Sequence, residues 1–222
     1  YLPFVNTTHP GLLDRMLANQ TSMFNYHSGL EATHPYSSSW YEWPTMVRPI
    51  WYYSGYVTDA IKEGISAFGN PVVWWIGIPA FIYILYLLIR NNAFLCSLTG
   101  HTKTESSTDT AITLSHREYA TAAFLAVGYL AQYLPWFFVT RITFIYHYFP
   151  SVPFVVLIIV YSLMQWKKHV SDRAFVIGCC AYATVAFALF LLFYPVLSGQ
   201  PVDVDFVIKY LRWRPTWVLI SG

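Results

Sequence analysis

The sequence predicts an all-α integral membrane protein with four transmembrane helices and an outward-facing N-terminal region. Hydrophobic residues make up 56% of the chain and charged residues only 11%, whereas a soluble domain has about a quarter charged residues. Four apolar segments approach the roughly 20 residues that cross a bilayer, and Lys and Arg gather in the connections between them. The net charge of +2 gives no reason to expect a nucleic-acid partner. The predicted transmembrane helices are 71–90, 119–134, 152–166 and 174–197.

Residues 1–69 are too polar to span a membrane and form the first of two predicted parts. Within them, Leu13, Met16, Leu17, Phe24 and His27 recur at helical spacing, which predicts an amphipathic helix between about residues 10 and 30. Its apolar face could lie on the membrane surface or pack on the protein, and the sequence leaves both alternatives open.

The same region contains the aromatic stretch "HPYSSSWYEWPTMVRPIWYY" at 34–53. Tryptophan and tyrosine favour the headgroup layer of a membrane, so an interfacial belt is the simpler interpretation. Carbohydrate sites use the same residues, because the apolar faces of sugars stack on aromatic rings. The spacing of Glu42 and Arg48 does not by itself make a catalytic pair.

The second part, 70–222, holds the four helices, and its least regular stretch is "YLPWFFVTRITFIYHYFPSVPF" at 133–154. A single helix through this stretch would place Arg141 in hydrocarbon, at a cost of several kcal/mol. Pro135, Pro150 and Pro153 would also break it. We therefore predict two short helices joined by an outward loop, 135–151.

The sidedness follows from the excess of Lys and Arg in cytoplasmic loops. Basic residues concentrate in and beside the 91–117 connection and in the 167–173 turn, which are predicted to be cytoplasmic, the former as a Ser/Thr-rich linker. The 135–151 loop contains a single Arg and faces outward, as do residues 1–69 and the tail, 198–222, although the tail's own basic residues argue weakly against this. The cytoplasmic basic residues are Arg90, Lys103, Arg117, Lys167, Lys168 and Arg173.

Three further motifs accompany the stretches at 34–53 and 133–154, namely "GNPVVWW" (69–75), "FYPVLSG" (193–199) and "LRWRPTW" (211–217). Together these motifs resemble the C-terminal half of the protein O-mannosyltransferases, in the family's order and over nearly the whole chain. This resemblance implies a membrane enzyme that transfers mannose from a polyprenyl or dolichyl phosphate to Ser or Thr hydroxyls of secreted proteins, with inversion.

The resemblance also implies the partners and the location. These are a polyprenyl-phosphate-mannose donor, an acceptor polypeptide, membrane lipids and the N-terminal half of the same enzyme; no cofactor or metal is expected. Eukaryotic members carry a β-trefoil domain for which the 1–69 region is too short. A compact bacterial member in the plasma membrane is therefore expected, or the endoplasmic reticulum membrane if the source is eukaryotic.

One departure from the family pattern concerns catalysis. The family's catalytic Asp, with a neighbouring Glu, lies in the first outward loop of the full enzyme, and no acidic residue here has that context. Inverting transfer needs a base that takes the acceptor proton. We therefore expect the catalytic Asp upstream of this chain, and the chain alone to be inactive.

Arg141 is the principal candidate for the donor phosphate, because a guanidinium binds phosphate in a bidentate manner. The simpler alternatives are that Arg141 reaches lipid headgroups and that His147 satisfies a buried carbonyl. The predicted donor-binding residues are Arg141, His147, Tyr146 and Tyr148. The predicted vestibule or acceptor-side residues are His34, Trp40, Glu42, Trp43 and Arg48.

Two other functions fit the sequence. One is a related lipid-donor transferase with a lipid or other non-protein acceptor, and the other is a non-catalytic membrane scaffold. A pump or channel is disfavoured, because transport pathways use charges within the membrane and the cores of the four segments contain no Asp, Glu, Lys or Arg.

Overall fold

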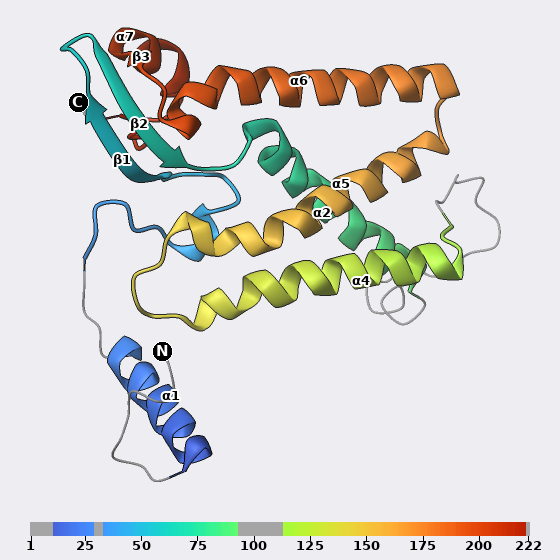
Figure 1. Ribbon diagram of the computed structural model, residues 1–222. Coiled ribbons are helices and arrows are strands. Elements are labelled where there is room, and N and C mark those ends of the chain that lie inside the picture. The colour runs from blue at the N-terminus through green and yellow to red at the C-terminus, as the bar shows by residue number, and fades with distance from the viewer. Residues whose placement is uncertain (1–10, 29–32, 93–112, 221–222) are drawn as a thin grey trace.

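The computed structural model describes residues 11–28, 33–92 and 113–220 (Figure 1). Each of the four apolar segments forms a helix, and the four run back and forth across the molecule (Figure 1). Helix α2 packs against α4 and α5, and α5 also packs against α4, whereas α6 contacts the others less. The four helices are α2 (Pro71–Asn91), α4 (His116–Tyr133), α5 (Val152–Lys167) and α6 (Asp172–Ser198).

Three of the described helices are long and apolar enough to cross a membrane, namely Pro71–Asn91, Ile145–Lys167 and Asp172–Ser198. Helix α4 falls short of this, because Arg117, Glu118 and other polar residues lower its mean hydropathy. The membrane character and the mainly helical fold are thus confirmed, while the fourth span at 119–134 stays a prediction.

Local signals explain where these helices begin and end. Asn70 accepts a hydrogen bond from the backbone N–H of Val72, and Pro71 occupies the first turn of α2, where its missing N–H costs nothing. Ser115 and Glu118 form a capping box at the start of α4. Helix α6 ends at Gly199, which has φ 76°, a left-handed conformation that suits glycine.

The prediction of an all-α protein is wrong at the end of the bundle that is predicted to face outward. A three-stranded antiparallel sheet lies there (Figure 1), and we call this part the outward layer after that prediction. Strand β1 (Ile50–Tyr56) pairs with β2 (Ile61–Ala67), which pairs with the short β3 (Val202–Asp203). The "IWYY" start of β1 has the aromatic and β-branched residues that strands favour. The sequence pattern left an interfacial belt and a carbohydrate site open for these residues, and neither interpretation included a strand.

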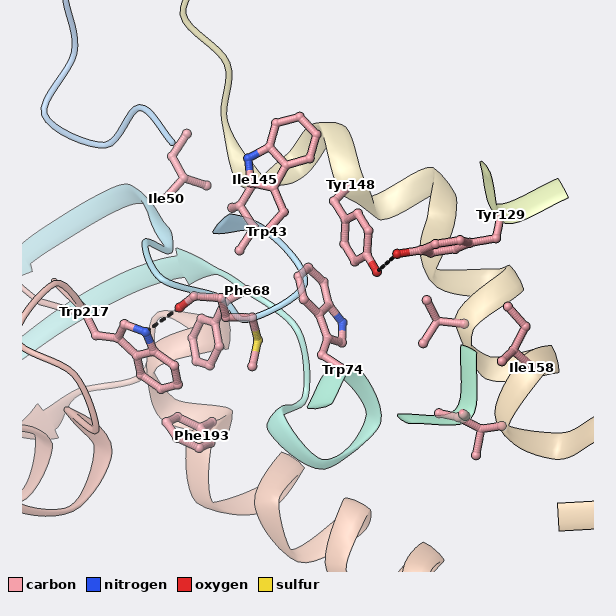
Figure 2. Packing of buried hydrophobic residues seen from close by; sticks show 14 of the residues in the cluster. Trp43, Ile50, Phe68, Trp74, Tyr129, Ile145, Tyr148, Ile158, Phe193 and Trp217 are labelled. Carbon is pink, nitrogen blue, oxygen red and sulfur yellow. Dashed lines mark hydrogen bonds between the residues drawn. The ribbon is translucent and has the colours of Figure 1, made fainter. Parts of the chain in front are cut away.

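The C-terminal segment packs on this outward layer and closes it. Trp217 is 1% exposed and packs against Phe68 and Phe193, and its indole N–H donates to the carbonyl of Met46 at 2.7 Å (Figure 2). The Thr216 hydroxyl donates to the carbonyl of Val47. The predicted outward tail is therefore an integral part of the outward layer.

Helix α1 (Leu12–Ser28) forms where the amphipathic pattern predicts a helix. It stands apart from the four-helix bundle (Figure 1) and has no extensive contact with the other described elements. Leu13 and Phe24 on its apolar face are both 72% exposed. Of the two alternatives that the sequence left open, packing on the described part of this chain is not seen, and the membrane surface stays a proposal.

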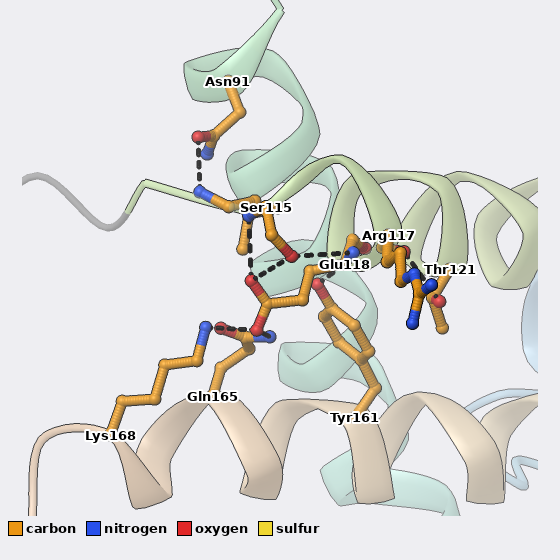
Figure 3. A network of polar contacts seen from close by, with 9 residues as sticks. Asn91, Ser115, Arg117, Glu118, Thr121, Tyr161, Gln165 and Lys168 are labelled. Carbon is orange, nitrogen blue, oxygen red and sulfur yellow. Dashed lines mark hydrogen bonds and ion pairs between the residues drawn. The ribbon is translucent and has the colours of Figure 1, made fainter.

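At the opposite end of the bundle, a polar network joins α4 to α5 (Figure 3). Glu118 forms an ion pair with Lys168 and accepts a hydrogen bond from the backbone N–H of Ser115 at 2.9 Å. The Tyr161 hydroxyl donates to the Glu118 carbonyl at 3.0 Å. This is the end where the cytoplasmic connections are predicted; residues 93–112 of the predicted linker lie outside the described residues.

The Glu118–Lys168 pair should make stability depend on pH. Lys168 and Ser115 lower the pKa of Glu118 from 4.5 to about 2, so the pair stabilises the fold above pH 4.5 and this contribution is lost as the pH falls toward 2. Lys168→Met should lower the free energy of unfolding at pH 7 by about 0.5–1 kcal/mol. It should also flatten the acid dependence of the unfolding midpoint in detergent.

Lys167→Met is the matched control, because its partner Asp172 is 92% exposed at the side chain and 3.8 Å away. If the unfolding midpoint falls equally with decreasing pH in wild type and in Lys168→Met, the stabilising role of the Glu118–Lys168 pair is contradicted.

Candidate binding site

A polar pocket of about 370 Å³ lies at the end of the molecule that is predicted to face outward. It forms between two segments far apart in the sequence, residues 37–48 and 140–143, and it brings together three of the predicted site residues, Arg141, Glu42 and Arg48. Most of its lining carries hydroxyl or charged groups. The lining residues are Ser37, Ser38, Ser39, Glu42, Arg48, Thr140, Arg141, Ile142 and Thr143.

Ser38 and Thr143 join the two walls of this pocket. The Ser38 N–H donates to the Thr143 carbonyl at 2.9 Å, and the Thr143 hydroxyl donates to the Ser38 carbonyl at 2.8 Å. Both residues are buried, so these bonds are shielded from water and fix the Arg141 loop against residues 37–39. The sequence prediction gave no role to either residue. The Ser run before Trp40 and the threonines that flank Arg141 were the available signals.

Arg48 uses its guanidinium to shape the pocket wall. Its Nη1 donates to the carbonyls of Pro35 and Ser37, both at 3.1 Å. These carbonyls belong to the segment that carries Ser38 and Ser39. Arg48 therefore acts mainly as a positioning residue for that segment.

Arg141 differs from Arg48 in having no such partner. It is half-buried in the pocket, and none of the residues that the structure describes accepts a hydrogen bond or forms an ion pair with its guanidinium. A half-buried guanidinium without an acceptor favours an anionic ligand, because its five N–H donors otherwise lose hydrogen bonds to water. The pocket therefore offers a cation to a bound anion.

His147 lies near this loop with one ring nitrogen already engaged. Its Nδ1 is 3.1 Å from the backbone nitrogen of Phe144 and 3.0 Å from the Phe144 carbonyl oxygen, so Nδ1 is engaged with Phe144 in either tautomer. The ring packs against Trp136 and Tyr146, with centroid distances of 4.3 and 4.4 Å. Tyr146 is exposed and stacks on Phe144. Neither residue lines the pocket, and the Nε2 of His147 and the hydroxyl of Tyr146 remain candidates for contact with a ligand that extends beyond it.

Two predicted site residues, Trp43 and Tyr148, lie in the core instead (Figure 2). Trp43 is 1% exposed, and its indole N–H donates to the Ser38 hydroxyl at 3.0 Å. Tyr148 is 3% exposed, and its hydroxyl pairs with that of Tyr129 at 3.0 Å. Neither side chain lines the pocket. Trp43 supports Ser38 in the pocket wall, whereas Tyr148 packs against Trp74 of α2 and Tyr133 of α4.

His34 and Trp40 lie outside the pocket lining. The His34 ring meets Phe144 edge-on at 5.2 Å, and its Nδ1 accepts from the Tyr36 N–H. Trp40 packs against Tyr133, whose hydroxyl donates to the Trp40 carbonyl at 3.0 Å. Both therefore belong to the aromatic surroundings of the pocket.

A second, apolar groove of about 780 Å³ lies between the N-terminal ends of α2 and α5. Its lining is almost entirely hydrocarbon, with Asn70 as the polar exception. Among the described residues, no three His, Cys, Asp or Glu side chains come together as metal ligands would. The groove is lined by Phe68, Gly69, Asn70, Val73, Trp74, Phe149, Val152, Pro153, Val156 and Leu157.

Residues 12–217 match the family model described as the C-terminal four TMM region of protein-O-mannosyltransferase. The chain belongs to the protein O-mannosyltransferase family. Its arrangement is also similar to a solved structure of the Saccharomyces cerevisiae protein O-mannosyltransferase Pmt1-Pmt2 complex bound to the sugar donor. That similarity has a TM-score of 0.72 at 18% identity and covers 94% of this chain and 27% of the yeast chain. At this identity the likeness shows the fold alone.

Relatives in this family come from fungi, animals and bacteria. The chain is 23% identical over 210 residues to dolichyl-phosphate-mannose–protein mannosyltransferase 5 of Candida albicans, covering 91% of this chain and 28% of that protein. It is 23% identical over 211 residues to polyprenol-phosphate-mannose–protein mannosyltransferase of Mycobacterium tuberculosis, covering 87% of this chain and 35% of that protein. The chain thus spans about a third or less of these relatives' length.

Proposed function

We propose that this chain is the C-terminal membrane module of an inverting glycosyltransferase that moves mannose from a polyprenyl phosphate to Ser or Thr hydroxyls of secreted proteins. The observation that carries the proposal is the unpartnered guanidinium of Arg141, half-buried in a pocket lined with hydroxyl groups. In this reaction the leaving group is a lipid phosphate. A fixed guanidinium stabilises the charge that develops on it.

The surroundings of Arg141 fit the rest of such a donor. His147 and Tyr146 can donate further hydrogen bonds to the phosphate or the sugar beside the pocket. The apolar groove between α2 and α5 offers hydrocarbon contacts to a polyprenyl chain. The mycobacterial relative is named for a polyprenol-phosphate-mannose donor and a protein acceptor, which supports the same donor and acceptor classes here.

The general base is proposed to come from the N-terminal half of the same enzyme. Glu42 is the only acid that lines the pocket among the described residues, and one of its oxygens already accepts the Ser39 N–H at 2.6 Å. The family resemblance instead places the Asp that takes the acceptor proton upstream of this chain. The proposed setting of the complete enzyme is a bacterial plasma membrane, or the endoplasmic reticulum membrane if the source is eukaryotic.

The proposal is tested with the complete enzyme that contains this chain. Purified enzyme is given polyprenyl-phosphate-mannose and a Ser/Thr peptide, and mass spectrometry and NMR measure the transferred hexose and its anomeric configuration. We expect mannose on the hydroxyl with the configuration opposite to that of the donor, and none on a matched Ala peptide. Transfer to lipid but not peptide would support the alternative transferase, and no transfer to any acceptor would support a scaffold.

A further inference from the structure

Glu42 lines the same polar pocket as Arg141, and its side chain is held in place by a hydrogen bond. Its Oε2 accepts the Ser39 N–H at 2.6 Å in a capping box, and its carbonyl accepts from Thr45 and Val47. No described residue donates to its other oxygen, Oε1. The carboxylate is therefore held rigidly with one acceptor atom uncommitted.

The two pocket arginines do not neutralise this carboxylate at close range. Neither Arg48 nor Arg141 lies within ion-pair distance of Glu42 among the described residues, and the Nη1 of Arg48 is bonded to the Pro35 and Ser37 carbonyls. Glu42 thus shares a pocket with a free guanidinium and with the hydroxyl-bearing residues Ser37, Ser39 and Thr140.

This combination fits a sugar phosphate. A phosphate needs cationic donors, whereas sugar hydroxyls donate best to an ionised carboxylate, which only accepts hydrogen bonds. In a glycosyl phosphate the two groups are joined through the anomeric carbon, so one small pocket must serve both. The volume of 370 Å³ falls within the range of about 300–1,000 Å³ that is usual for small-ligand sites.

We infer that Glu42 binds hydroxyl groups of the transferred sugar while Arg141 binds the phosphate, and that Glu42 thereby sets which glycosyl donor is used. The inference rests on the proposed function. Hexoses differ from one another in the orientation of single hydroxyl groups. A fixed acceptor discriminates strongly among them, because the wrong isomer leaves a buried polar group unpaired.

The test compares wild-type complete enzyme with Glu42→Gln on mannosyl polyprenyl phosphate and on its 2-, 3-, 4- and 6-deoxy analogues. Glutamine preserves the capping-box acceptor but removes the charge. Glu42→Gln should lower kcat/KM for the mannosyl donor by about 10- to 100-fold, the range of a charge-assisted hydrogen bond. On the analogue that lacks the bound hydroxyl, the kcat/KM of the wild type should fall by the same factor relative to the mannosyl donor. The kcat/KM of Glu42→Gln should be no lower on this analogue than on the mannosyl donor.

Glu63→Gln is the matched control, because Glu63 lies on β2 outside the pocket and bonds the Tyr53 hydroxyl; its kcat/KM should be unchanged. Wild-type activity of Glu42→Gln on every donor would overturn the inference. A loss of kcat/KM in Glu42→Gln that is equal, relative to wild type, on the mannosyl donor and on every analogue would also overturn the inference, whether or not the unfolding midpoint falls. Glu42 would then act only in the capping box with Ser39. Absence of peptide mannosylation by the wild-type enzyme would overturn the proposed function itself, and the inference with it.

Discussion

Arg141→Ala in the complete enzyme is expected to lower kcat/KM for mannose transfer by about 10²- to 10³-fold, the usual effect of removing a group that stabilises developing charge. The guanidinium has no partner among the described residues, so its loss breaks no internal bond and the unfolding midpoint should hold. Arg141→Lys should recover part of the loss, because it restores the charge but not the bidentate fork.

Arg212→Ala is the control for this experiment. Arg212 is an exposed outward cation that bonds the Pro215 carbonyl away from the pocket, so its removal should leave kcat/KM unchanged. Wild-type turnover by Arg141→Ala would refute the phosphate assignment and favour the alternative that Arg141 contacts membrane headgroups.

Trp43→Ala is expected to have the largest effect on stability, with the free energy of unfolding lowered by about 3–5 kcal/mol. Trp43 is 1% exposed, packs against Trp136 and His147, and bonds Ser38. Its removal leaves a cavity beneath the pocket wall. Activity should fall together with the unfolding midpoint in detergent, because the same residue supports Ser38.

Tyr41→Ala tests whether this effect depends on burial. Tyr41 lies in the 3₁₀ turn Trp40–Glu42, directly before Trp43, but is 65% exposed, so its removal should change the free energy of unfolding by less than about 0.5 kcal/mol. Similar losses in the two variants would contradict the assignment of Trp43 to the core.

Hydropathy and helix-end signals in the sequence were enough to predict the four helices within a few residues. They could not predict the sheet, because the "IWYY" segment fits both a membrane belt and a strand. Strand β3 also comes from residues 202–203, far from β2. Such pairing depends on contacts between distant segments, which local patterns do not contain.

The candidate site could also be predicted only in part, because local patterns do not show which distant segments meet. Arg141, Glu42 and Arg48 were singled out by residue type, and the structure brings them to one pocket. The contact that assembles this pocket joins Ser38 to Thr143, 105 residues apart in sequence, and no local pattern indicates it. Trp43 and Tyr148 were misplaced because an amphipathic aromatic residue suits a buried hydrogen-bonded position as well as an interface.

The closure of the outward layer by Trp217 has a consequence for biosynthesis. Its bond to Met46 and that of Thr216 to Val47 connect residues 171 and 169 positions apart, and Arg48 follows directly in the pocket lining. A growing chain cannot make these contacts before residues 216–217 have been synthesised. The segment beside the pocket therefore gains its last contacts only after all four helices have been synthesised.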